Sequence, residues 1–114
     1  MSLIVFDLIK PRWEKFRSAT SVQITRVKRL RELTLQGEAI SRDMHQRQRN
    51  EFHPRVQPTI ETWAQAVLAE IHGEAFAEHY GFETMPFAGK LDKLREITAR
   101  LGTKYRVKVS DVAG

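Results

Sequence analysis

The stretch TIETWAQAVLAEI, residues 59–71, constrains the fold of this chain more than any other. Large apolar residues recur along it at helical spacing: Ile60, Trp63, Val67, Leu68 and Ile71. This spacing places them on one face of an α-helix, and that face needs another element to cover it. Because Trp63 lies in the middle of the face, we expect it to anchor the core. Residues 53–58, HPRVQP, precede this helix and predict the main connector, since a proline disfavours helix in the residue before it.

The region before this connector, residues 11–52, is predicted to be helical and basic. Pro11 suits the first position of a helix, where a missing N–H has no cost. From there an apolar stripe continues at helical spacing through Trp13, Phe16, Thr20, Ile24, Val27 and Leu30. Further along, the apolar residues move to a new face that also carries Gly37, so we expect a bend or break over residues 34–38. A second helix should then reach about Asn50.

The region after the connector combines helices with shorter elements. An acidic helix is predicted over residues 59–81, an apolar loop over 82–90 and another helix over 91–102. Residues 104–110, KYRVKVS, alternate apolar and basic side chains and predict a half-buried strand. Residues 1–10 are dense in apolar side chains and predict an apolar arm or a buried strand. The expected fold is mainly α: a single small helical domain of three to four helices with short N- and C-terminal β-strands or arms.

Length and composition place the chain among small intracellular proteins. The 114 residues fit one domain, and 41% hydrophobic with 29% charged residues is ordinary for a folded chain. Because there is no cysteine, disulfide frameworks and thiolate zinc sites are excluded. The longest apolar run, Leu3 to Phe6, is far shorter than the roughly 20 residues that span a bilayer. We expect a protein of the cytoplasm or of an assembled particle, neither secreted nor in contact with a membrane.

Charge is distributed unevenly along the chain, whose formal net charge is +5. Residues 10–31 hold eight basic residues and one acidic residue, and residues 89–108 hold seven basic and two acidic residues. Between them, residues 59–88 hold five acidic residues and no Lys or Arg. A basic surface permits nucleic acid or an acidic protein as partner. The acidic middle offers another use for the same cations, because it can pack against the chain's own basic helix.

Two interpretations of the basic residues remain open. On one helix running from Pro11, basic side chains lie on both flanks of the apolar stripe, as expected when aliphatic stems cover a core edge and charged heads stay in water. One flank is also a partial stripe suited to nucleic acid: Arg12, Lys15, Arg26 and Arg29. The predicted C-terminal strand adds three more cations to this second interpretation: Lys104, Arg106 and Lys108.

No catalytic, metal or cofactor site is predicted. The stretch HGEAFAEH, residues 72–79, holds the one His/Glu cluster of the chain. On a helix, His72 and His79 are about 10.5 Å apart, which is too far for one metal ion to bridge. Glycine-rich phosphate loops and serine-elbow patterns are absent from the sequence. We therefore expect a protein that is not an enzyme and that carries no cofactor.

The apolar residues outside the predicted helices indicate how the protein binds others. The loop over 82–90 carries Phe82, Met85 and Phe87, which lie either inside the monomer or against a protein partner. The N-terminal arm adds Phe6 and Ile9 as contact residues, because both faces of so apolar a segment need cover.

These features predict a non-enzymatic binding or assembly subunit that acts through helix and arm contacts in a larger complex, such as a virion. Self-association through the arm is part of this prediction. The alternative is a small basic nucleic-acid-binding protein, either a regulator or a packaging factor.

Overall fold

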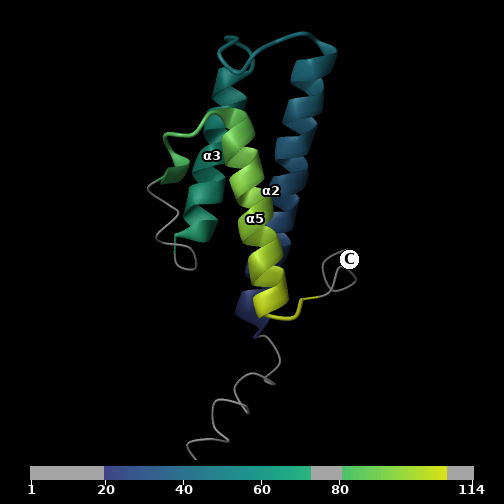
Figure 1. The fold of residues 1–114 in the computed structure, drawn as a ribbon, viewed down its shortest axis with the longest axis vertical. Coiled ribbons are helices and arrows are strands. Elements are labelled where there is room, and N and C mark those ends of the chain that lie inside the picture. The colour runs from purple at the N-terminus through teal and green to yellow at the C-terminus, as the bar shows by residue number, and fades with distance from the viewer. Residues whose placement is uncertain (1–19, 73–80, 108–114) are drawn as a thin grey trace, which may run out of the picture.

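The computed structural model describes residues 20–72 and 81–107 of the chain. Three helices form most of this part: α2 (Ser21–Gln46), α3 (Gln57–Ile71) and α5 (Phe87–Lys104). Figure 1 shows them side by side, with the α2–α3 connection at the end of the molecule where α5 begins. α2 packs against both other helices, and the described residues contain no strand. The prediction of a small, mainly helical domain is confirmed.

α2 begins at a capping box on Thr20, which is not itself helical. Thr20 is extended, with φ −71° and ψ 162°, and its hydroxyl accepts the N–H of Gln23 at 3.2 Å. The Gln23 side chain accepts the N–H of Thr20 in return at 2.8 Å. These bonds satisfy backbone groups that a helix start leaves open. The prediction of one helix from Pro11 to Leu30 is therefore wrong at Thr20. The predicted arm or strand over residues 1–10 lies outside the described residues.

α2 is continuous for 26 residues, so the predicted break over residues 34–38 is wrong. Gly37 is buried inside this helix. A Cβ atom at Gly37 would lie 2.7 Å from Leu91 Cδ1 and 2.8 Å from Trp63 Cζ2. Glycine is required here because side chains from α3 and α5 meet the α2 backbone at this point. Packing along the whole helix offsets the low helix propensity of one glycine.

The end of α2 is closed by backbone hydrogen bonds. Gln48 adopts the left-handed conformation with φ 54°. Its N–H donates to the carbonyl of His45 at 3.2 Å, and the N–H of Arg49 donates to the carbonyl of Met44 at 2.9 Å. This pattern ends a helix by satisfying its last carbonyls. The helix predicted to reach Asn50 therefore ends at Gln46.

The connector is placed slightly earlier than the predicted residues 53–58, since α3 begins at Gln57 and Pro58 lies in its first turn. The acidic helix predicted over 59–81 is helical from residue 59 to residue 71, and residues 73–80 lie outside the described part. Its apolar face is buried, with Trp63 only 3% exposed. The helical spacing of the sequence therefore identified both the element and its inner face.

α5 begins at Phe87, inside the loop predicted over 82–90 and ahead of the helix predicted over 91–102. Its N-cap residue, Pro86, makes no side-chain cap. Instead, the carboxylate of Glu51 accepts the N–H of Phe87 at 2.9 Å from 36 positions earlier in the chain. A cap supplied from so far away leaves no local signal in the sequence.

The C-terminal end of α5 replaces part of the strand predicted over 104–110. Lys104 is the last residue of the helix, and Arg106 is left-handed with φ 54°. The N–H groups of Arg106 and Val107 donate back to carbonyls of the last helical turn, at 3.2 and 2.9 Å. Tyr105 and Val107 pack on the core from this turn, so their alternation does not arise from a strand.

One apolar core joins the three helices. The ring of Trp63 packs edge-on against Phe87, with centroids 5.3 Å apart, and its centroid lies 6.4 Å from that of Phe82. Such edge and tilted contacts are favourable geometries for aromatic pairs. The other buried apolar residues of this core are Val27, Leu30, Leu33, Val56, Ile60, Ala64, Val67, Leu68, Ile71, Leu91, Leu94, Ile97, Leu101 and Val107.

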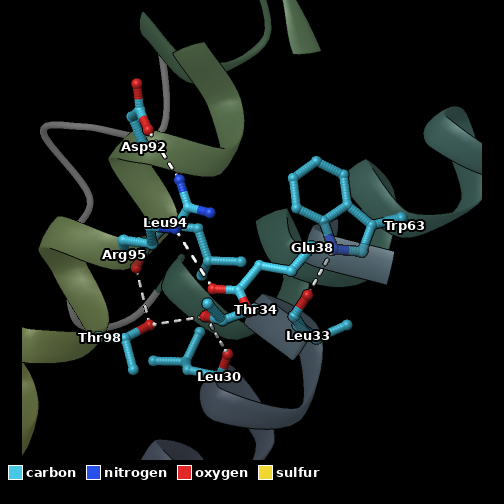
Figure 2. A network of polar contacts seen from close by, with 9 residues as sticks. All are labelled: Leu30, Leu33, Thr34, Glu38, Trp63, Asp92, Leu94, Arg95 and Thr98. Atoms are coloured by element: carbon cyan, nitrogen blue, oxygen red, sulfur yellow. Dashed lines mark hydrogen bonds and ion pairs between the residues drawn. The ribbon is translucent and has the colours of Figure 1, made fainter. Parts of the chain in front are cut away.

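A polar seam follows the contact between α2 and α5, as Figure 2 shows. The hydroxyl groups of Thr34 and Thr98 lie 3.5 Å apart across it. One turn along α2, Glu38 pairs with Arg95 at 3.4 Å. The seam therefore marks the flank of α2 that faces α5.

Candidate functional site

Three of the five residues predicted to contact a partner lie in the described part of the chain, and two of these three are buried. Phe82 is fully buried and Phe87 is 4% exposed, whereas Met85 is partly buried. The two phenylalanines thus occupy the monomer core, which is the first of the two positions considered for this loop. Phe6 and Ile9 lie outside the described residues, and their role as partner contacts stays a prediction.

The structure describes four of the seven basic residues predicted to contact nucleic acid, two on α2 and two at the end of α5. Arg26 and Arg29 are on the flank that faces α3, where both line a hollow with Glu70. Lys104 and Arg106 are at the end of α5, which packs on the other flank (Figure 2). The remaining three lie outside the described residues: Arg12, Lys15 and Lys108. The stripe that would join Arg12 and Lys15 to Arg26 and Arg29 therefore stays a prediction.

A surface groove runs between α2 and α3. Its main part has a volume of about 600 Å³ and is lined by Arg29, Gln36, Ala39 and Ile40 of α2 and by Pro58, Thr59, Thr62, Trp63 and Ala66 of α3. A hollow of about 400 Å³ shares Arg29 with it and extends to Val22 and Glu70. We call the two together the α2–α3 groove. Ile40 and Ala66 are partly buried and pack on the core beside Trp63, so the floor of the groove is apolar.

The charges of the α2–α3 groove come mainly from α2. Arg26 and Arg29 line it on that side, while Glu70 lines it on the α3 side. Arg29 pairs with Glu32 at 3.2 Å, and the two side chains are 42% and 61% exposed. An exposed ion pair contributes about 0–1 kcal/mol, so Arg29 can exchange Glu32 for an acidic group of a ligand.

Phe52 is the most exposed of the large apolar residues in the described part, at 73%. It lies in the turn between α2 and α3. The prediction of a helical region over residues 11–52 did not identify Phe52 as an exposed turn residue. Val22 and Leu35 follow, at 68% and 64%. A signal for Phe52 was available, because the residues three and four positions before it are polar, so the apolar stripe of the preceding helix does not lead to it.

Within residues 20–72 and 81–107, no group of three or more His, Asp or Glu side chains is placed to hold a metal ion. No helix in these ranges combines the length and the apolar character needed to cross a membrane. Comparison with known protein families, with curated proteins and with solved structures found no match. The α2–α3 groove and the turn around Phe52 therefore have to be interpreted from their own chemistry.

Proposed function

We propose that the protein is a non-enzymatic binding subunit of a larger protein assembly, and that its α2–α3 groove receives an amphipathic helix of the partner. The observation that carries this proposal is the groove itself: an open channel of about 600 Å³ with an apolar floor between two helices. Apolar grooves between helices are a common receptor for the apolar face of a third helix.

The walls of the groove suit a helix because they include several small side chains. Ala39 on α2 and Thr59, Thr62 and Ala66 on α3 allow another backbone to approach to the 8–10 Å typical of packed helices. Along α3 the lining extends from Pro58 to Glu70, a length of about 18 Å at the rise of an α-helix. A partner helix of about three turns fills this length.

The charges of the groove favour a partner helix with an acidic flank. Among the described residues that line the groove, Arg26 and Arg29 stand on the α2 wall and Glu70 stands on the α3 wall. The whole chain is also basic, with a formal charge of +5. Glutamates on the flank of the incoming helix that faces α2 would meet these arginines, and complementary charges of this kind steer association and set register.

A designed peptide tests the proposal without knowledge of the natural partner. The probe is a labelled helix of about 14 residues with leucines at helical spacing and glutamates beside them. Fluorescence anisotropy should show that it binds the native protein more tightly than a peptide with the same composition in scrambled order.

A groove-filling substitution provides the matched control. Thr62→Trp places a large ring in the groove and should abolish binding, whereas Gln65→Trp, on an exposed position of α3 outside the lining, should leave binding unchanged. Equal binding by both variants would place the peptide elsewhere and overturn the proposal.

A further inference from the structure

The turn between α2 and α3 holds Phe52 outward on an ordered backbone. The side chain of Asn50 accepts the N–H of Phe52 at 2.9 Å, and the imidazole Nδ1 of His53 accepts the N–H of Arg55 at 3.1 Å. On either side, Glu51 is bonded to the start of α5 and Val56 is buried at 5% exposure. Glu51 and Val56 thus tie the turn to the rest of the molecule, while Phe52 is 73% exposed.

Two arginines flank Phe52 in the sequence, Arg49 three positions before it and Arg55 three positions after it. Of the acids nearby, Asp43 pairs with Arg47 at 2.8 Å and Glu51 accepts the N–H of Phe87. Arg49 and Arg55 form no ion pair with any described residue. The turn therefore presents an aromatic face together with guanidinium groups that lack an acidic partner in the described part of the chain.

We infer that this turn contacts single-stranded nucleic acid, with Phe52 stacked on an unpaired base and Arg49 and Arg55 on flanking phosphates. Exposed aromatic rings and arginines are the two elements of such sites, because every base has a face for stacking and every nucleotide has a phosphate. The inference rests on the turn alone and stands independently of the α2–α3 groove.

An acidic protein surface is the other ligand with complementary charge, but the composition of the turn favours nucleic acid. The centre of a protein interface is a fully buried apolar core to which several side chains contribute. Here Phe52 is the one large exposed apolar side chain of the turn, and arginines flank it. A base that stacks on Phe52, with a phosphate on each side for an arginine, matches this arrangement.

The test is binding of the full chain to a labelled oligothymidylate of about 20 nucleotides, measured by fluorescence anisotropy at about 50 mM salt. Phe52→Ser should raise the Kd about tenfold, since stacking on one aromatic ring contributes an effect of this size. Leu35→Ser is the matched control, because Leu35 is 64% exposed on α2 outside the turn, and it should leave the Kd unchanged. Arg55→Gln should lower the slope of log Kd against log salt by about 0.7.

Several results would overturn the inference. One is equal affinity for the single strand and for a duplex of the same length, because stacking requires unpaired bases. Another is an oligonucleotide Kd that Phe52→Ser does not change, or the absence of binding. If Phe52→Ser instead weakens the binding of the acidic peptide, the turn is a contact for a protein partner. Thr62→Trp separates the two proposals, since it should block the peptide and leave the oligonucleotide bound.

Discussion

Trp63 donates its indole N–H to the backbone carbonyl of Leu33 at 2.7 Å, a buried bond between residues 30 positions apart (Figure 2). The indole reaches this carbonyl because Gly37, one turn further along α2, has no side chain in the way. The bond and the glycine together set how closely α3 approaches α2. They therefore also set the width of the α2–α3 groove.

Gly37→Ala should destabilise the protein, although alanine is the better helix former by about 1 kcal/mol. The added methyl group would lie within 3 Å of Leu91 and Trp63, and overpacking of this kind typically costs about 1–3 kcal/mol. Gly89→Ala in α5 is the control, because its Cβ would come no closer than 3.4 Å to Met85. Urea unfolding should separate the two variants. A Gly37→Ala protein at least as stable as Gly89→Ala would show that Gly37 is not a packing position.

Trp63→Ala should lower the free energy of unfolding by about 3–5 kcal/mol. The substitution removes the aromatic contacts to Phe82 and Phe87 and leaves the Leu33 carbonyl without its indole donor. In a domain of this size such a loss is a large part of the total stability. Thermal denaturation followed by circular dichroism measures it. An unchanged melting temperature would contradict the role of Trp63 as core anchor.

Gln48→Gly should stabilise the protein by about 0.5–1 kcal/mol, because the left-handed conformation at φ 54° strains any residue with a Cβ. Gln46→Gly, two residues earlier in the last turn of α2, should destabilise by a comparable amount, because glycine is a poor helix former. Opposite shifts of the urea midpoint are expected. Shifts of the same sign would mean that Gln48 gains more from its side chain than it loses in the backbone.

Glu51→Ala should cost about 1 kcal/mol, because it removes the acceptor for the first N–H of α5. Glu61→Ala, an exposed acid on α3, should have an effect within about 0.5 kcal/mol. Hydrogen exchange of the first turn of α5 measures the effect locally. Unchanged protection there would show that the Glu51–Phe87 bond does not hold the helix start.

The parts of the fold that depend on residues close together in the sequence could be predicted from it. The apolar face of α3 repeats at helical spacing, so Trp63 and its neighbours were recognisable as core. The capping box of Thr20 and Gln23 is also a local signal, and it was available although the predicted helix ran through it.

The parts that depend on distant residues could not be predicted in this way. A single sequence does not distinguish a glycine that breaks a helix from a glycine that leaves room for Trp63 and Leu91. The start of α5 depends on Glu51 from another turn. The α2–α3 groove depends on how two helices pack, and a periodic pattern reports burial but not the spaces left between elements.

The central claim, that the α2–α3 groove receives a helix with an acidic flank, is tested most directly by reversing one charge in it. The dissociation constants of the glutamate peptide and of its lysine counterpart should be measured for the native protein, for Arg29→Glu and for Arg42→Glu, an equal charge change on α2 outside the groove lining. The native protein and Arg42→Glu should prefer the glutamate peptide, and Arg29→Glu should prefer the lysine peptide. Equal effects of the two substitutions, or no preference in the native protein, would contradict the claim.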